Sequence, residues 1–316
     1  MSLGPGREFD LIRELARRWG PRARDIGGDC AVVEAGGERL ALSIDVSVEN
    51  VHFRRAWMTP REIGYRAAAA ALSDLAAVAA EPIGLLLTIS VPEHDAGDTV
   101  LAIGEGAGDA AADAGAIILG GDMSRGSAIV VDCCVIGRSP AASRSGARPG
   151  DRLVVTGALG GPLAALESWN AGREPDAEAR ARFVKPAPRH AAARFLAQHR
   201  ARAMIDLSDG VAGDARHLLA AGNLGARIDA DRLPLLHSAR MAAQAAGEPA
   251  WRFAARSGEE YELLAALPAD VTDDELRHGP VPVTVIGAFE EQPGLRAFAD
   301  GAEVELPSSH DHFGWT

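Results

Sequence analysis

Short aliphatic segments alternate with alanine-rich segments along residues 40–137, and this order limits the folds open to the chain. Residues 40–48 and 84–91 are rich in Leu, Ile and Val, as strands are, whereas residues 60–80 are mostly alanine. A second helix is expected over residues 98–114. Strands interleaved with helices of this length predict an α/β or α+β architecture rather than a helical bundle or an all-β sandwich.

Capping signals support the two helices. Thr59 can cap the first helix, Pro60 suits its first position, and Glu62 can close a capping box. Gly115 is well placed to end the second helix. A further amphipathic helix is expected over residues 9–19.

The remaining part of the N-terminal half is expected to be strands and turns. Residues 117–119 are interpreted as a strand that enters a turn at Gly120-Gly121-Asp122, and residues 128–137 as another strand.

A charged, turn-rich segment at residues 144–151 marks the expected domain boundary. We therefore expect an N-terminal domain of residues 1–145 and a C-terminal domain of residues 146–316, which is within the usual size range. The second half also alternates: strands are expected at residues 153–156, 226–228, 261–266 and 283–287, with helices after Gly161 and over residues 211–220.

Charge composition narrows the possible partners. The chain has 44 acidic and 32 basic residues, a formal net charge of −12, which argues against a general nucleic-acid binder. Divalent cations between protein and ligand would still let it bind a polyanion such as ATP. The longest apolar run, residues 83–91, is too short to span a membrane, and the first residues contain no long apolar run typical of a signal peptide. These features indicate a cytoplasmic protein.

Lys185 is the only lysine, so a P-loop, which needs a Gly-Lys pair, is excluded. The Gly104-Glu-Gly106-Ala-Gly108 segment lies in a predicted helix and indicates packing rather than a dinucleotide site. No Gly-x-Ser-x-Gly motif is present, which counts against an α/β-hydrolase.

Six aspartates stand out because they interrupt apolar segments or follow glycine and small residues. A single aspartate of this kind is ordinarily a turn residue or a helix cap. Asp45 lies in a predicted strand and Asp74 in a predicted helix, where a carboxylate needs a partner. Mg²⁺ prefers carboxylate oxygens, so a magnesium site and a set of turn residues both remain open. The six are Asp29, Asp45, Asp74, Asp122, Asp206 and Asp209.

Nine segments form an ordered set that spans nearly the whole chain. They begin at Glu8, Gly28, Ser43 (with Val51-His52-Phe53), Leu72, Gly120, Arg144, Ile205, Ser257 and Asp311. In this order they resemble the thiamine-monophosphate kinase family, which belongs to a superfamily with aminoimidazole ribonucleotide synthetase, and together they are far more specific than any one alone.

The resemblance implies a two-domain aminoimidazole ribonucleotide synthetase-like fold whose N-terminal domain forms the sheet of a homodimer. It implies transfer of the γ-phosphoryl group of ATP to thiamine monophosphate, assisted by several Mg²⁺ ions, in a cleft between the domains. No nucleic acid and no membrane is implied as a partner.

The same resemblance implies roles for individual residues. Asp45, Asp122 and Asp209 would be catalytic. ATP contacts would come from Gly121, Asp122, Arg144 and Ser208, and contacts to the thiamine substrate from His52, Glu259 and His310. The metal ligands would be Asp29, Ser43, Ile44, Asp45, Asp74, Asp122, Asp206 and Asp209.

The chain departs from the family pattern at four places. Gly28 replaces an aspartate, Ile44 replaces a threonine, Met123-Ser124 replaces a pair of threonines, and His310 replaces an aromatic residue. At Ile44 a backbone carbonyl would remain as a ligand.

Two alternatives stay open. One is another ATP-using enzyme of the same superfamily; the Glu259-Glu260-Tyr261 and His52-Phe53 segments favour the thiamine enzyme. The other is a catalytically silent protein that binds nucleotide or thiamine phosphate, which the retained aspartates disfavour.

Overall fold

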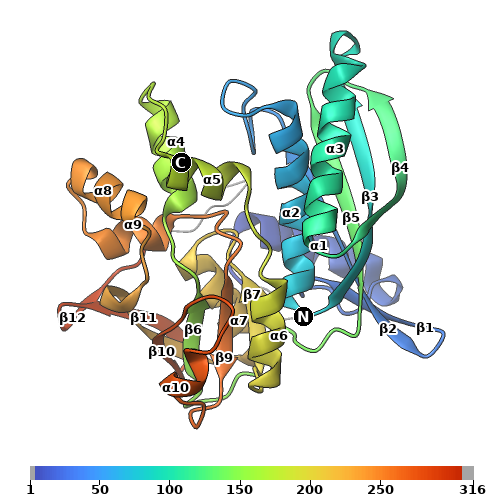
Figure 1. The fold of residues 1–316 in the computed structure, drawn as a ribbon. Coiled ribbons are helices and arrows are strands. Elements are labelled where there is room, and N and C mark those ends of the chain that lie inside the picture. Colours follow the sequence, from blue (N-terminus) through green and yellow to red (C-terminus); the bar gives the residue numbers. More distant parts are fainter. Residues whose placement is uncertain (1–3, 308–316) are drawn as a thin grey trace.

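The computed structural model describes residues 4–307 and contains two sheets, one in each half of the chain (Figure 1). The first sheet has the strand order β1-β2-β5-β3-β4. All its neighbours are antiparallel except β3 and β4, which are parallel. Its strands are β1 (Ala31–Ala35), β2 (Glu38–Val48), β3 (Glu81–Val91), β4 (Ile117–Arg125) and β5 (Val130–Arg138).

The strands and helices expected in this half are confirmed, with one correction and one omission. The turn expected at residues 120–122 is wrong, because β4 runs on through these residues to Arg125. The Gly120-Gly121 pair indicated a turn, but both glycines adopt positive φ values within the strand. Strand β1 was not predicted; its residues are all exposed, so it lacks the buried alternation that reveals a strand.

Helices α2 (Pro60–Ala77) and α3 (Asp98–Asp113) cover one face of this sheet (Figure 1). The predicted capping box at Thr59 and Glu62 is present. The two helices pack very closely: a Cβ on Gly64 would lie 1.9 Å from the carbonyl oxygen of Ile103, and one on Gly106 would lie 1.8 Å from that of Arg61. Only glycine fits at these two contacts.

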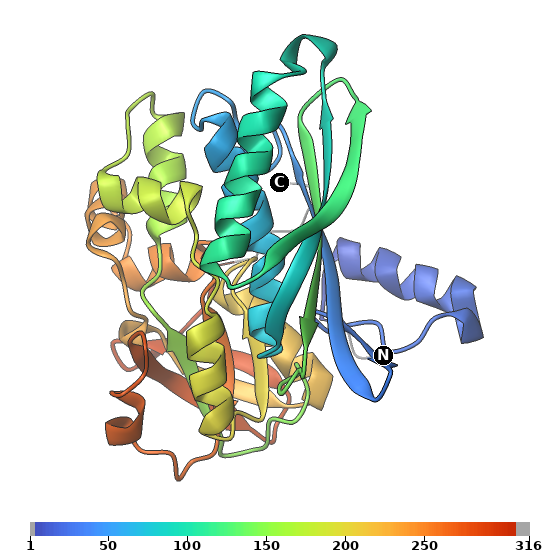
Figure 2. The same cartoon turned by 45° about the vertical axis from the view of Figure 1, so that its right-hand side comes forward.

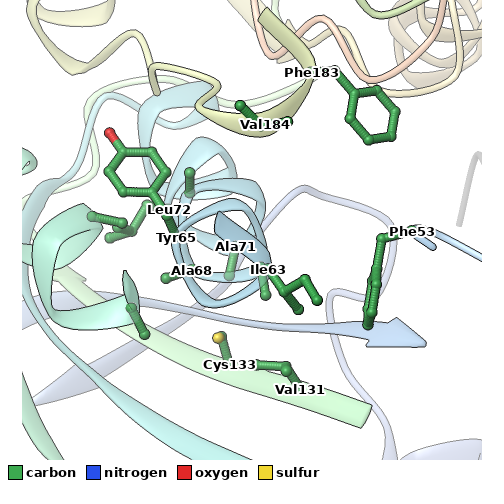
Figure 3. Packing of buried hydrophobic residues seen from close by; sticks show 14 of the residues in the cluster. Phe53, Ile63, Tyr65, Ala68, Ala71, Leu72, Val131, Cys133, Phe183 and Val184 are labelled. Carbon is green, nitrogen blue, oxygen red and sulfur yellow. The ribbon is translucent and has the colours of Figure 1, made fainter. Parts of the chain in front are cut away.

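Helix α2 is buried on two sides, which explains its alanine-rich sequence. Val131 and Cys133 of the sheet lie against one side of the helix, and Phe183 and Val184 from the second half lie on the other (Figure 3). Small side chains let both layers approach the helix closely. Helix α2 is therefore a shared wall between the halves of the chain.

Helix α1 (Arg7–Trp19) extends away from the rest of the protein beside the first sheet, as the dark blue helix in Figure 2 shows. It has an amphipathic pattern yet no buried residue; Leu11, Leu15 and Trp19 are all more than 40% exposed.

The second sheet has the order β12-β11-β8-β10-β6-β9-β7 and is mostly antiparallel, with β8 and β11 parallel. Its strands are β6 (Arg152–Thr156), β7 (Ala203–Asp206), β8 (Gly225–Asp229), β9 (Leu263–Leu267), β10 (Val283–Glu290), β11 (Gly294–Ala299) and β12 (Ala302–Val304). The strand expected at residues 261–266 begins two residues later than predicted, because Tyr261 has a positive φ of 52°.

The other helices pack around this sheet and against α2. They are α4 (Gly161–Asn170), α5 (Ala177–Val184), α6 (His190–Gln198), α7 (Val211–Gly222), α8 (His237–Ala246), α9 (Ala250–Arg256) and α10 (Asp273–Leu276), with 3₁₀ turns η1 (Gly20–Arg22), η2 (Glu93–Asp95) and η3 (Ala230–Arg232). Among residues 4–307, no helix is both long and apolar enough to cross a membrane.

Candidate active site between the two halves

Three of the predicted aspartates meet where the two halves of the chain touch. Asp29 precedes β1, Asp74 lies near the end of α2, and Asp206 ends β7 of the second sheet. Each offers a carboxylate oxygen, and these oxygens lie within 4.8 Å of one another. Asp29 and Asp206 are buried and Asp74 is half-buried. We call these three residues the carboxylate triad.

Without a bound cation, burial and mutual repulsion disfavour the negative charges of the triad. Burial raises the pKa of Asp206 to about 7, and the charge of Asp29 contributes. Burial also raises the pKa of Asp74 well above its usual value, with added repulsion from Asp206 and Asp29. Carboxylates held together in this way would otherwise share protons, so the arrangement favours a divalent cation.

Hydroxyl and guanidinium groups orient the three carboxylates. Ser43 donates a hydrogen bond to Asp74, and Ser73 donates one of 2.8 Å to Asp206. Arg144 pairs with both oxygens of Asp29, at 2.7 and 3.1 Å. Outer groups of this kind fix ligand orientation at metal sites. Arg144, expected to contact ATP, thus holds a triad carboxylate in this structure.

A cavity of about 540 Å³ opens beside the triad and is lined from both halves of the chain. Its size is in the range of small-molecule sites. The structure brings eight of the predicted site residues to its wall: Ile44, Asp45, His52, Asp74, Asp206, Ser208, Asp209 and Glu259.

Gly121 and Asp122 are not brought to this wall. Asp122 is exposed on β4, with β3 and β5 between it and β2. At ordinary strand spacing this separation is about 14 Å. The register pairs Asp122 with Thr88, Thr88 with Asp132 and Asp132 with Val46, so Asp122 shares the face of Val46 rather than that of Asp45.

Ile44 and His310 are two further predicted site residues. The Ile44 side chain is 68% exposed and alternates with Ser43 and Asp45, so only its backbone carbonyl is suited to the metal role. His310 lies outside the described residues.

His52 and Glu259 are both held firmly at the cavity wall. The backbone N–H of Val48 donates to Nδ1 of His52 at 3.1 Å. Glu259 has a positive φ of 56° and pairs with Arg66 of α2, whose side chain is only 4% exposed. This ion pair joins the two halves of the chain across the cavity.

Arg66 and Asp214 are site residues that the sequence reasoning missed. Arg66 interrupts the alanine-rich helix just as Asp74 does, so the same criterion would have found it. Asp214 is buried in the first turn of α7 and accepts a 3.2 Å hydrogen bond from the Asp209 backbone N–H. Its sequence signal was a carboxylate among small and apolar residues five positions after Asp209.

Two buried glutamates anchor the backbone on either side of Tyr261. Glu260 accepts a hydrogen bond from the Gly160 backbone N–H, and Glu262 accepts from Arg182, Arg189 and Thr156. This anchoring holds the left-handed backbone conformations of Glu259 and Tyr261, which would be strained if left unsupported.

The donor set fits Mg²⁺. All three triad ligands are carboxylates, which hard cations prefer, and no histidine or cysteine takes part in the triad. A magnesium ion here would bridge residues from both halves of the chain and face the cavity, where further oxygens from a phosphate could complete its coordination.

Comparison with known proteins gives a family for this architecture. Residues 27–139 match the model "AIR synthase related protein, N-terminal domain", and residues 148–300 match the corresponding C-terminal domain. The thiamine-monophosphate kinase of Mycobacterium tuberculosis strain H37Rv is 34% identical over 97% of this chain and 92% of its own length. That of Escherichia coli strain K12 is 34% identical over 97% of this chain and 98% of its own length.

Solved structures agree with the sequence relatives. A structure described as AaThiL complexed with AMPPCP and TMP has a TM-score of 0.87 and 30% identity, and the match covers 98% of this chain and 97% of that one. A hydrogenase maturation protein from Escherichia coli has a TM-score of 0.73 at 21% identity, which shows the shared fold alone.

Proposed function

The chain belongs to the AIR synthase related family, and we propose that it is a thiamine-monophosphate kinase that transfers the γ-phosphoryl group of ATP to thiamine monophosphate. The observation that carries this proposal is the carboxylate triad at the junction of the two halves, beside a cavity of about 540 Å³. Phosphoryl transfer depends mainly on positioning and charge neutralisation, which such a site supplies.

The triad residues Asp29, Asp74 and Asp206 would hold Mg²⁺, with Asp45 and Asp209 at the same wall of the cavity. Bound Mg²⁺ supplies positive charge against the phosphates of both substrates. The backbone carbonyl of Ile44 and the hydroxyl of Ser43 would complete the metal-ligand set expected from the family.

The reaction needs no strong general base. A phosphate oxygen of thiamine monophosphate is already anionic and forms the new bond to the γ-phosphorus, while the bond from that phosphorus to the β–γ bridging oxygen breaks. ADP leaves and thiamine diphosphate forms. Asp45 and Asp209 would serve as Mg²⁺ ligands that help to position the reacting phosphates, rather than as bases that remove a proton.

The binding roles of the remaining residues are those that the family resemblance implies. Ser208 and Gly121 are proposed to contact ATP, and His52 and Glu259 the thiamine substrate, together with His310. Arg144 would orient Asp29, its partner in the structure, and its positive charge would attract the phosphates. Asp122 keeps its proposed role in catalysis and metal binding, although two strands separate it from β2.

We also propose a homodimer formed through the first sheet. The face of this sheet opposite α2 exposes large apolar side chains, a feature that monomers rarely show over a wide area. A second copy packed there would bury these side chains and also cover Asp122. The exposed residues on this face of β2 and β3 include Ile44, Val46 and Leu86.

The domain division proposed is residues 1–145 and 146–316. It is supported by the two sheets, which end and begin at Arg138 and Arg152. A cytoplasmic location remains a prediction from the sequence.

The kinase is tested by incubating the purified protein with ATP, Mg²⁺ and thiamine monophosphate and measuring thiamine diphosphate. Asp45→Asn should lose turnover while its circular dichroism spectrum stays unchanged. ATP binding without any product would identify a silent binding protein instead.

A further inference from the structure

The cavity has two chemically different ends. One end carries the carboxylates Asp45, Asp74, Asp206 and Asp209. The other is lined by Phe53 and Trp57, which follow β2, and by Leu163 and Leu166 of α4. A ligand that spans the cavity therefore has its anionic part at one end and an apolar or aromatic part at the other.

Trp57 is the part of the apolar end with the most distinctive chemistry. Its ring stacks on Trp169 at a centroid distance of 5.2 Å and an interplanar angle of 6°, and Phe183 meets both rings edge-on. Trp57 itself is only partly buried and reaches the cavity. This packing fixes the orientation of the indole without covering it fully.

A cation already lies over this ring. The guanidinium carbon of Arg54 is 4.6 Å from the centroid of Trp57, and Arg54 also lines the cavity. Among the described residues, no carboxylate forms an ion pair with Arg54, whereas Arg66 pairs with Glu259 and Arg256 pairs with Glu167 and Glu248. The exposed Arg54 side chain is thus held at the indole by the ring alone and is easily displaced.

We propose that Trp57 binds the positively charged thiazolium ring of the substrate through a cation–π contact, taking the place of Arg54, and so selects a cationic ring over a neutral one. This inference rests on the proposed function, because it takes the acceptor phosphate to lie at the carboxylate end. The rings of thiamine monophosphate then extend towards Trp57. Tryptophan is the strongest cation–π partner among the aromatic side chains.

The contact explains a selectivity that the carboxylates alone would not provide. The acidic wall attracts any cation, including free Mg²⁺, and acts over a long range. A flat indole beside Leu163 and Leu166 instead favours a cation that is flat, weakly hydrated and aromatic.

Steady-state kinetics on Trp57→Leu and Trp57→Phe test the inference. The two acceptors are thiamine monophosphate and 3-deazathiamine monophosphate, in which a neutral thiophene replaces the thiazolium ring. In Trp57→Leu the KM for thiamine monophosphate should rise about tenfold, within the range of a desolvated cation–π contact, while the KM values for the neutral analogue and for ATP change less than about twofold. Trp57→Phe should give a smaller change of the same kind.

Two controls separate binding from packing. Trp169→Phe alters the stack behind Trp57 and should lower thermal stability without changing the KM ratio of the two acceptors. Arg54→Ala should leave the KM for thiamine monophosphate unchanged or lower it, because a competing cation is removed.

A failure of this inference can be distinguished from a failure of the proposed kinase activity. A ratio of the two KM values that stays the same in folded Trp57→Leu and Trp57→Phe overturns the inference, while wild-type turnover keeps the proposed function. Absence of thiamine diphosphate with the wild-type protein overturns both.

Discussion

The guanidinium group of Arg144 and the carboxylate of Asp29 form a two-point ion pair, with N–O distances of 2.7 and 3.1 Å. Arg144 lies in the segment that connects the two sheets, and Asp29 belongs to the carboxylate triad. The pair links the connection between the halves of the chain to the expected metal site. The Asp29 side chain is fully buried, and Arg144 supplies the counter-charge beside it.

Arg144→Met should destabilise the metal-free protein, because it leaves a buried carboxylate without its counter-charge. The expected loss in free energy of unfolding is about 3 kcal/mol, and Mg²⁺ should restore part of it. Urea unfolding in EDTA and in Mg²⁺ measures both values. Arg138→Met, at an exposed pair with Glu81, should cost less than about 1 kcal/mol. Equal losses in the two variants would contradict the structural role given to Arg144.

Relative to Asp206→Asn, the metal-free wild-type protein should lose stability as pH rises from about 4 to about 7. An aspartate in an unfolded chain titrates near pH 4, whereas burial raises the pKa of Asp206 to about 7 in the folded protein. The folded state therefore binds more protons in this interval, and each extra proton lowers the free energy of unfolding by about 1.4 kcal/mol per pH unit. Asp74, whose pKa is also raised by burial, acts in the same direction.

Calorimetry in buffers of different ionisation enthalpy gives a second measurement of the same effect. Mg²⁺ binding at pH 6 should release protons, because a carboxylate must ionise to coordinate the metal. Asp206→Asn should release fewer. Proton uptake on binding, or a wild type that gains stability relative to Asp206→Asn over this pH interval in EDTA, would show that the Asp206 carboxylate is ionised without metal.

Local signals in the sequence predicted most of the elements in the first half of the chain. The capping box at Thr59 and the alanine-rich sequence that follows it were sufficient to predict α2, which the structure confirms. The turn at residues 120–122 was wrong because positive φ at Gly120 and Gly121 occurs within a strand as well as in turns. Strand β1 has no buried face, so no local pattern predicts it.

The triad was predicted as a set of candidates, but its geometry was beyond sequence reasoning. Asp29, Asp74 and Asp206 are separated by 45 and 132 residues, so only the packing of α2 between the halves places them together. The same local reasoning placed Asp122 with them, although β3 and β5 lie between it and β2. Arg66 interrupts the same alanine-rich helix as Asp74, but no local signal shows its partner, Glu259, which is 193 residues away.

Glu262→Gln should destabilise the C-terminal half. The Glu262 side chain is fully buried and is shared by Arg182 and Arg189, so the neutral amide leaves Arg189 without its counter-charge and Arg182 with Glu260 alone. We expect a loss of about 3 kcal/mol in the free energy of unfolding by urea. Glu290→Gln, at the more exposed pair with Arg296, should cost less than about 1 kcal/mol. A loss at Glu262 no larger than at Glu290 would contradict the anchoring role.

Leu86→Glu should convert the proposed dimer into a monomer. Leu86 is 41% exposed on the outer face of the first sheet, and a buried unpaired carboxylate there would oppose association. Light scattering after gel filtration should give twice the 32.9 kDa chain mass for the wild type and one chain mass for the variant. Leu101→Glu, at a 64% exposed position on α3, serves as the control and should remain dimeric. A monomeric wild type would contradict the proposed dimer.

The central claim is that the carboxylate triad holds the Mg²⁺ that supports phosphoryl transfer to thiamine monophosphate. Its most direct test is the rate of thiamine diphosphate formation by the wild type and by Asp74→Asn across a Mg²⁺ titration. The wild type should form product, and Asp74→Asn should be at least about 100-fold slower and require more Mg²⁺, with an unchanged circular dichroism spectrum. Undiminished turnover by Asp74→Asn at the same Mg²⁺ concentration would contradict the claim.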